Sequence, residues 1–318
     1  MKWIVGEIYW PKYKIDKDCD IFSLTEIFQI IGAYKLKEGV IVLYRKLLRL
    51  WVLKRLYSSR VPILFSLANV IVETLENKIS SEEKTCINKI EHLRKELEAS
   101  SKEMTIMDYG RRSPDSDLTP QQMYQGKVIT KTIGDVCRTN SKSIFWSLLL
   151  FKLIREYRPS VCLELGTSLG ISAAYQAAAL ELNKNGELVT LEGSESLASL
   201  AIENFNKLSL KRVFVRLGRF QDILDDVLAE LGNVDYAFID GHHDGDATLE
   251  YFEKIIPFLS EFALIVFDDI SWSKGMKEAW RKIVKYKSVK VSVDFGNLGI
   301  IILSNSIEKK RGYNFYLI

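Results

Sequence analysis

The segment VCLELGTSLGISAAYQAAAL, residues 161–180, constrains the fold of this chain more than any other stretch. It begins with an apolar strand pattern that reaches Glu164, continues through a turn bracketed by Gly166 and Gly170, and passes into a run of small, mostly helix-forming residues. A strand, a glycine turn and a helix N-terminus in this order are typical of the ligand-binding edge of a doubly wound parallel sheet. The segment therefore predicts an α/β fold with a ligand pocket at this turn.

The residues around the turn narrow the class of ligand. The glycines do not follow the G-x-G-x-x-G pattern of dinucleotide enzymes, and no Gly-Lys-Ser/Thr sequence marks a phosphate loop. Glu164 favours a ligand with a cationic or polar head and no pyrophosphate, a description that S-adenosylmethionine fits. A second strand, Glu187–Leu191, ends in Glu192 and Gly193, where a carboxylate accepts ribose hydroxyls. An ordinary strand–turn–helix without a ligand is the alternative, and Glu192 in register favours the cofactor pocket.

Apolar strand patterns recur regularly after residue 150, with helical patterns between the first five. The candidates are residues 161–164, 188–191, 213–217, 236–239, 263–267, 289–293 and 299–303. This alternation predicts a Rossmann-like, doubly wound, mostly parallel sheet of seven strands. Only DFGNL separates the last two strands, so they are expected to form an antiparallel hairpin at the sheet edge.

The part of the chain before residue 145 has mostly helical patterns. Residues 39–57 combine apolar and basic residues, which suits a membrane-surface helix or, as we prefer, a docking helix with its arginines facing water. Residues 82–102 form a charged helical pattern with one apolar face, and residues 113–122 are expected to be a loop. We predict a boundary between a mainly helical region, 1–144, and an α/β domain, 145–318.

Composition excludes several classes of protein. Of the 318 residues 47% are hydrophobic and 27% charged, a globular balance, and the net charge of +3 gives no case for nucleic acid. The four cysteines show no C-x-x-C spacing, which argues against a structural zinc site or a disulfide framework. The longest apolar stretch, residues 61–72, is too short to span a bilayer, and no signal peptide is expected. These features predict a cytoplasmic protein.

Four motifs in order carry a resemblance to a known family. They are ELGTSLGIS at 164–172, TLEG at 190–193, LGRFQDIL at 217–224, and the pair FIDGHH at 238–243 and VFDDISWSKGM at 266–276. Together they resemble the class I S-adenosylmethionine-dependent methyltransferases, and are most similar to the catechol and caffeoyl-CoA O-methyltransferase group. A reversed final strand is a further feature of that class. The resemblance covers residues 145–305.

The resemblance implies S-adenosylmethionine as cofactor, with adenine at the turn after the third strand. The implied cofactor contacts are Glu164, Gly166, Thr167, Ser168, Ser172, Glu192, Gly193, Gly218, Phe220, Gln221 and Asp240.

Three aspartates are expected to converge where the fourth and fifth strands end. Asp240 follows one strand and Asp268 and Asp269 the next, and adjacent parallel strands open onto one crevice. Converging carboxylates repel one another unless a cation or proton joins them, and Mg²⁺ prefers oxygen ligands of this kind. The resembled group binds that metal with an Asp and an Asp-Asn pair at these positions. Here the second residue of the pair is Asp269, which adds charge; solvated loop residues or a helix cap are the alternatives.

Two histidines follow Asp240. Histidine titrates near neutral pH and can take a proton from a hydroxyl group. His243 falls where the resembled group has its general-base lysine, so His243, with Asp240, is the predicted catalytic residue. For His242 we expect a hydrogen-bonding role within the loop.

The predicted activity is O-methylation of a hydroxyl or carboxylate on a small molecule or peptide-like natural product. The alternative is an S-adenosylmethionine-binding module that acts in assembly or recognition with little turnover, whereas a nicotinamide dehydrogenase is disfavoured by the absent glycine fingerprint. The apolar helical faces of residues 1–144 are expected to dock on the core, as an acceptor lid, or on a second subunit of a homodimer.

Overall fold

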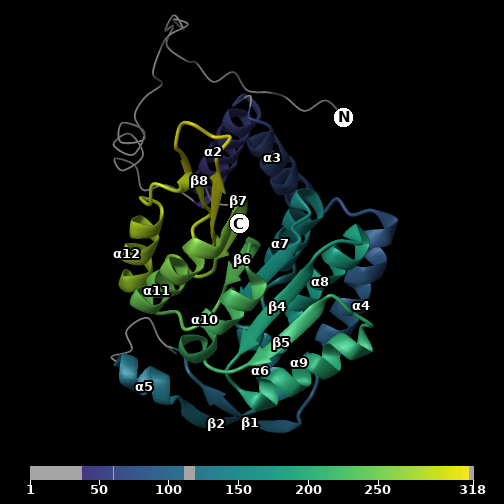
Figure 1. Cartoon of the computed structure of the whole chain (residues 1–318). Helices are drawn as coiled ribbons and strands as arrows, with labels where there is room; N and C mark the ends of the chain where they lie inside the picture. The colour runs from purple at the N-terminus through teal and green to yellow at the C-terminus, as the bar shows by residue number, and fades with distance from the viewer. Residues whose placement is uncertain (1–37, 60, 111–118, 315–318) are drawn as a thin grey trace, which may run out of the picture. The chain divides into compact units, whose positions relative to one another are not determined.

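A computed structural model of the chain describes residues 38–59, 61–110 and 119–314 (Figure 1). The chain divides into two units between Leu47 and Leu48, and of the first unit only residues 38–47 are described. The amino-terminal segment considered for a signal peptide lies outside the described residues. Within them, no helix is long and apolar enough to cross a membrane.

An eight-stranded sheet forms the centre of the second unit, in the order β10-β8-β9-β7-β6-β3-β4-β5. The strands β3 to β7 run parallel, β9 is antiparallel to both β7 and β8, and β10 is parallel to β8. Their bounds are β3 Val161–Leu165, β4 Glu187–Glu192, β5 Val213–Leu217, β6 Val234–Ile239, β7 Leu259–Phe267, β8 Val289–Asp294, β9 Gly299–Ser304 and β10 Arg311–Asn314. All seven predicted strands are present, and the predicted fold class is confirmed.

The last strands differ from the prediction in position. β8 and β9 form the expected antiparallel hairpin, but β9 lies between β7 and β8 rather than at the edge. Every residue of β9 is buried, whereas β8 alternates between buried and half-buried residues, and a strand that is apolar on both faces belongs inside a sheet. The unpredicted β10, which is four residues long, pairs with the outer side of β8.

Helices cover both faces of the sheet, and successive strand residues enter two different cores. Cys162 packs in the core that contains α7 and α8, whereas Leu163 packs in the core that contains α10 and α11. The helices that follow β3 to β7 are α8 Ile171–Asn183, α9 Glu195–Lys207, α10 Phe220–Leu231, α11 Gly245–Ile255 with a 3₁₀ turn Ile256–Phe258, and α12 Lys274–Ile283; α7 Ile144–Tyr157 precedes β3.

The region before residue 145 contains the predicted helices and one unpredicted hairpin. Its helices are α2 Glu38–Tyr57, α3 Pro62–Leu75, α4 Ser81–Glu98, α5 Pro120–Gln125 and α6 Ile133–Asn140. Strands β1 Glu103–Asp108 and β2 Lys127–Thr132 pair antiparallel, so the helix expected over 82–102 ends earlier, at Glu98. The loop expected at 113–122 is wrong at its end, because Thr119 caps a short helix from Pro120; residues 111–118 lie outside the described part.

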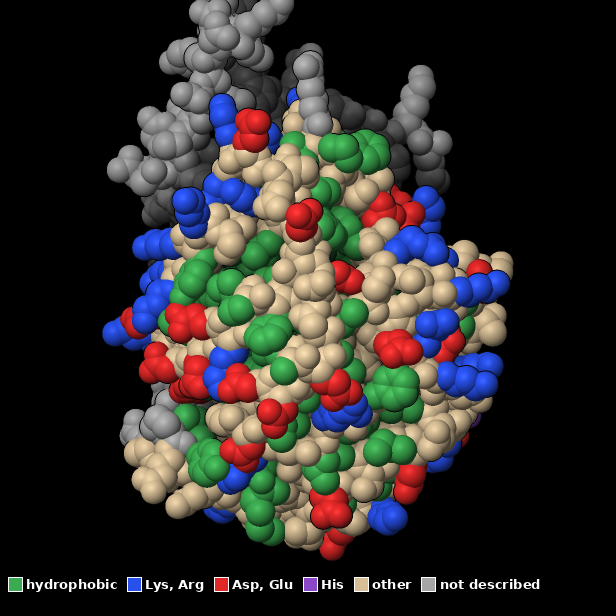
Figure 2. Space-filling model, viewed as in Figure 1, with side chains coloured by type: hydrophobic (Ala, Val, Ile, Leu, Met, Phe, Trp, Pro, Cys, Tyr) green, Lys and Arg blue, Asp and Glu red, His purple; other side chains and the backbone are tan. Residues whose placement is uncertain are grey.

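The docking interpretation of residues 39–57 agrees with the part of α2 whose side chains are described. Val52, Leu53 and Leu56 are buried, while the Arg55 guanidinium lies 4.7 Å from the ring centroid of Trp51. Charged side chains of both signs lie side by side over the face of the molecule shown in Figure 2.

Candidate functional site

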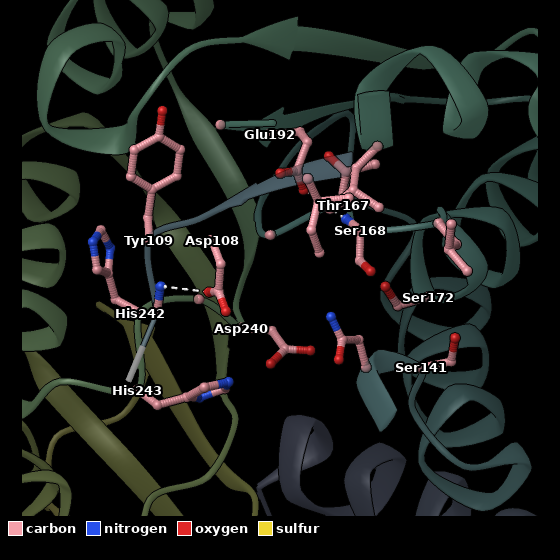
Figure 3. Close-up of a pocket in the computed structure, with 18 of the residues that line it drawn as sticks. Asp108, Tyr109, Ser141, Thr167, Ser168, Ser172, Glu192, Asp240, His242 and His243 are labelled. Atoms are coloured by element: carbon pink, nitrogen blue, oxygen red, sulfur yellow. Dashed lines mark hydrogen bonds between the residues drawn. The ribbon is translucent and has the colours of Figure 1, made fainter. Parts of the chain in front are cut away.

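A cavity of about 540 Å³ opens where β3, β4 and β6 end (Figure 3). Parallel α/β sheets bind ligands at this edge, and the volume suits a small-molecule ligand. The predicted site residues that line it are Gly166, Thr167, Ser168, Ser172, Glu192, Gly193, Phe220, Asp240, His243 and Asp269. The sequence analysis thus selected residues from five separate segments that the fold brings to one cavity.

Four predicted residues lie beside the cavity without lining it. Glu164 is fully buried beneath the glycine turn, and the Gly218 amide donates to the carbonyl of Glu192 at 2.9 Å. The Gln221 amide lies 3.2 Å from Nε2 of His242, and Asp268 pairs with Lys142. These residues support the cavity wall.

Backbone hydrogen bonds hold the turn after β3 against β4. The amides of Gly166 and Thr167 both donate to the carbonyl of Leu191, at 3.1 and 3.2 Å. The Thr167 hydroxyl lies 2.6 Å from that of Thr190. Gly166 has a φ of +106°, and a Cβ at this position would lie 2.1 Å from the carbonyl oxygen of Asp240. Only glycine fits where the two loops approach this closely.

Glu164 organises the floor of the cavity through its buried carboxylate. Its Oε1 accepts from Ser172 Oγ at 2.8 Å and from Gln176 Nε2 at 2.7 Å, and its Oε2 accepts from Thr190 Oγ1 at 2.6 Å. Burial raises the pKa of Glu164 to about 7, against the opposing effect of these three hydrogen bonds. Glu164 of β3 therefore joins α8 and β4.

The raised pKa of Glu164 predicts a pH-dependent stability. The pKa of Glu164 is about 7 in the folded protein, against an ordinary value of 4.5. Its contribution to the free energy of unfolding is therefore fully present below pH 4.5 and is lost as the pH rises through 7. The loss is at most about 3 kcal/mol, and Glu164→Gln removes it because an amide does not titrate. Thr190 can rotate its hydroxyl to accept from the new amide, so the hydrogen bond is kept. We expect urea unfolding to show that, from pH 5 to pH 8, the free energy of unfolding of the variant rises by about 2–3 kcal/mol relative to that of the wild type. Glu187→Gln, exposed at the start of β4, is the control; a gap between Glu164→Gln and wild type that is equal at both pH values would contradict the assignment.

Glu192 presents a carboxylate at the tip of β4, 9% exposed, on the cavity wall. Its Oε2 accepts from the Ser168 amide at 2.8 Å and its Oε1 from the Ser194 amide at 2.9 Å. Burial raises the pKa of Glu192, and these backbone donors oppose the rise. Each carboxylate oxygen keeps a further lone pair, so the group can accept two more hydrogen bonds from a ligand.

The two histidines after β6 have different environments. His242 is buried, with Nδ1 2.8 Å from the Tyr251 hydroxyl and Nε2 3.2 Å from the Gln221 amide, and burial lowers its pKa to about 4. His243 lines the cavity, with Nδ1 3.4 Å from Oδ2 of Asp269, and its ring reaches into the cavity in Figure 3. Both residues have positive φ, at 65° and 50°, which is costly outside glycine and is common at functional sites. The carboxylate of Asp269 therefore holds the imidazole of His243 where it can contact a ligand in the cavity.

The predicted aspartate cluster contains a lysine that the sequence analysis did not identify. Nζ of Lys142 contacts Oδ2 of Asp268 and lies 3.5 Å from Oδ2 of Asp240. Burial would lower the pKa of Lys142, but the charges of Asp240, Asp268 and Asp269 outweigh it and raise the pKa above its ordinary value. Burial and the neighbouring carboxylate of Asp268 raise the pKa of both Asp240 and Asp269. The cation of this cluster is therefore the ammonium of Lys142, which forms ion pairs with Asp240 and Asp268.

Residues before 145 form a further part of the wall, and none of them was predicted from the sequence. They include Asp108, Tyr109 and Gly110 at the end of β1, Thr139 and Asn140 at the end of α6, and Ser141 and Lys142 between α6 and α7. The β1 strand is fixed to α9, since Ser194 Oγ accepts from the Met107 amide at 3.2 Å and Ser196 Oγ donates to the Thr105 carbonyl at 2.7 Å. A Cβ on Gly193 would lie 2.7 Å from the Tyr109 ring, so the glycine after the acidic tip was the one available signal that another segment packs there.

Comparison with known proteins gives two sequence matches. Residues 163–270 match a family model described as a methyltransferase domain. A catechol O-methyltransferase of Niastella koreensis is 37% identical over 110 residues, which are 34% of this chain and 48% of that protein. The resemblance to the class I methyltransferases is confirmed. The chain matches about half the length of this relative.

Solved structures of methyltransferases also align with the chain. An O-methyltransferase from Bacillus cereus, in complex with S-adenosylhomocysteine, is 24% identical, covers 52% of this chain and 84% of its own, and has a TM-score of 0.46. An O-methyltransferase from Streptomyces achromogenes, in complex with S-adenosylmethionine, is 22% identical, covers 52% and 82%, and has a TM-score of 0.45.

The Mg²⁺ predicted from the methyltransferase resemblance does not fit the residues present. In the described part of the chain, no group of three or more His, Cys, Asp or Glu side chains has an arrangement that could hold a metal ion. The ammonium of Lys142 lies between Asp240 and Asp268, where a shared cation would have to bind, and like charges at this distance repel. The predicted metal ligands are brought together, but a lysine joins them.

Proposed function

We propose that this protein is an S-adenosylmethionine-dependent O-methyltransferase that acts on a hydroxyl or carboxylate of a small molecule or peptide-like natural product. One observation carries the proposal. Glu192 accepts a hydrogen bond from the Ser168 amide of the glycine turn, and both residues line the same cavity. Glu192 keeps the acceptor lone pairs that the ribose hydroxyls of a nucleoside require, and the turn holds its carboxylate in place through the Ser168 amide.

The cofactor fits the polar groups of the cavity. Ser168 Oγ and Gln221 Oε1 are two of the eight buried side-chain atoms of the described residues that have no hydrogen-bond partner. Buried polar atoms without partners are uncommon and call for an explanation, and a bound ligand supplies one for Ser168. Glu192 would accept from the ribose hydroxyls, and Phe220 lines the cavity near the turn proposed for adenine. The loop of Gly166, Thr167 and Ser168 would hold the methionine part.

The proposed mechanism is an in-line displacement. When bound, S-adenosylmethionine would supply a methyl group on a positively charged sulfur, with the sulfur keeping the bonding electron pair when the methyl group passes to the acceptor oxygen. His243 takes the acceptor proton, and Asp269 stabilises the imidazolium that results, at the 3.4 Å separation of Nδ1 and Oδ2. Asp240 lies in the same wall, 3.5 Å from the ammonium of Lys142. Proximity and the placed base account for the rate.

Residues 1–144 take part in acceptor binding in this proposal. The segments around Tyr109 and Lys142 line the cavity opposite the glycine turn, which supports a role in acceptor choice. Homodimerisation is a second proposed role, supported by the exposed apolar side chains of Leu50, Trp51 and Phe65. The two roles are compatible, because these side chains do not line the cavity.

Glu192→Ala tests the cofactor assignment. A carboxylate that accepts hydrogen bonds in a buried site contributes about 1.5–3 kcal/mol, so the dissociation constant of S-adenosylhomocysteine should rise tenfold or more. Isothermal titration calorimetry measures it directly. Glu187→Ala, exposed at the other end of β4, should leave binding unchanged. An unaltered dissociation constant in a folded Glu192→Ala protein would remove the basis of the proposal.

A further inference from the structure

Contacts at both its side chain and its backbone hold Lys142 in place. Its side chain is 17% exposed and lies on the cavity wall, with Nζ against Asp268 and 3.5 Å from Asp240. We propose that the Lys142 ammonium is the resident cation of the reaction site, taking the place of a divalent metal ion and positioning the acceptor oxygen. This inference rests on the proposed function for its last step only.

The backbone of Lys142 is anchored before the side chain reaches the carboxylates. The buried Arg94 of α4 donates from Nη1 to the Lys142 carbonyl at 2.8 Å, and Arg94 Nε pairs with Glu91 at 3.0 Å. Glu91 in turn accepts from the Tyr175 hydroxyl of α8 at 2.7 Å. A lysine held in this way is a built part of the site, unlike a surface lysine with many rotamers.

The donor geometry leaves the ammonium able to bind a ligand. An ammonium has three N–H donors, and Asp268 and Asp240 are placed to accept two of them. The third can reach an oxygen in the cavity beside His243. A hydroxyl held there donates its proton to His243 and presents a lone pair to the methyl group.

The same geometry predicts competition between the lysine and a metal ion. A divalent cation bound to Asp240 and Asp268 would lie beside the ammonium, and the repulsion would oppose its binding. Without the ammonium, the buried carboxylates of Asp240 and Asp268, close to Asp269, have no compensating positive charge. Carboxylates in this situation bind an available cation or a proton. Lys142→Ala should therefore create a metal site in a protein that has none at this cluster.

Titration of the full-length protein with Mn²⁺, followed by electron paramagnetic resonance, tests the competition directly. We expect Lys142→Ala to bind Mn²⁺ at least tenfold more tightly than the wild type and than Lys142→Arg, which keeps the positive charge. Lys131→Ala is the matched control, because Lys131 lines the same cavity, whereas the lysine paired with Asp240 and Asp268 is Lys142. Lys142→Met, which keeps the apolar stem, replaces Lys142→Ala if circular dichroism shows that the alanine variant does not fold.

Two outcomes of the Mn²⁺ titration would overturn the proposal. One is a wild type that binds Mn²⁺ as tightly as Lys142→Ala, and the other is a folded variant whose aspartates bind no Mn²⁺. A parallel titration with S-adenosylhomocysteine separates this result from the proposed function, since a protein that binds no S-adenosylhomocysteine still reports on the cation site. Where turnover is measured, the wild type should be unaffected by excess chelator; loss of its turnover in chelator would also overturn the proposal.

Discussion

Gly166→Ala is expected to destabilise the protein and abolish cofactor binding together. The new Cβ would lie 2.1 Å from the Asp240 carbonyl oxygen, and neither loop can move freely. The Gly166 amide is bound to Leu191, and the Asp240 amide donates to the Leu165 carbonyl at 2.9 Å. Strain at a φ of +106° and the steric clash together should lower the free energy of unfolding by about 2–5 kcal/mol. Affinity for S-adenosylhomocysteine should fall about a hundredfold or more, since displacement of the turn breaks the hydrogen bond from the Ser168 amide to Glu192.

Gly232→Ala separates the steric clash from backbone strain. Gly232 also has a positive φ, of 71°, but no atom lies within 4 Å of its added Cβ. Its substitution should lower the free energy of unfolding by about 1–2 kcal/mol and leave cofactor binding unchanged. Urea unfolding and calorimetric titration of both variants give the comparison. Equal losses in the two would show that the approach of the turn to Asp240 has no special importance.

The strands that position the site could be predicted because their side-chain pattern reflects burial. Val161–Leu165 and Glu187–Glu192 are buried over most of their length, and in a parallel sheet such strands form continuous apolar runs. The glycine turn and the acidic tip then follow at the strand ends, where the fold requires a turn. The apolar pattern locates the strand ends in the sequence, and the site residues of the turn and the acidic tip lie at those ends.

The hairpin β1–β2 could not be predicted from the same kind of pattern. In Glu103–Asp108 only Ile106 is buried, and in Lys127–Thr132 none of the residues is, so neither strand shows a clear apolar face. The strands are fixed by their pairing with each other and by the contact with α9, which are interactions between distant segments. Tyr109 enters the site because of these contacts.

Lys142 could not be predicted for a related reason. It lies in a short polar link before α7, where a lysine is ordinary, and its partner Asp268 is 126 residues away. The sequence did indicate that the three aspartates need a compensating charge, since converging carboxylates repel. It did not indicate which of a metal, a proton or a side chain supplies that charge, because the answer depends on Arg94 and the packing of α4.

His243→Ala is expected to lower turnover by 10²–10⁴-fold while the dissociation constant of S-adenosylhomocysteine stays within about twofold of the wild type. His243 is held between Asp269, at 3.4 Å, and the Trp272 ring, whose centroid is 5.6 Å from its own. A general base acts only on the proton that the acceptor loses, so its removal changes kcat and leaves cofactor binding in place. Turnover is measured as release of S-adenosylhomocysteine with a panel of catechols and phenols as acceptors.

The third histidine gives the control for this prediction. His92 is on α4, with a side chain 78% exposed and paired with Glu96 at 3.2 Å, and His92→Ala should keep full turnover. His243→Gln keeps most of the side-chain volume but cannot take a proton, so it should lose as much turnover as His243→Ala. If His243→Gln retains wild-type turnover, His243 fills space beside Trp272 and another group removes the proton. The aspartate with the raised pKa in the same wall, Asp240, is then the next residue to substitute.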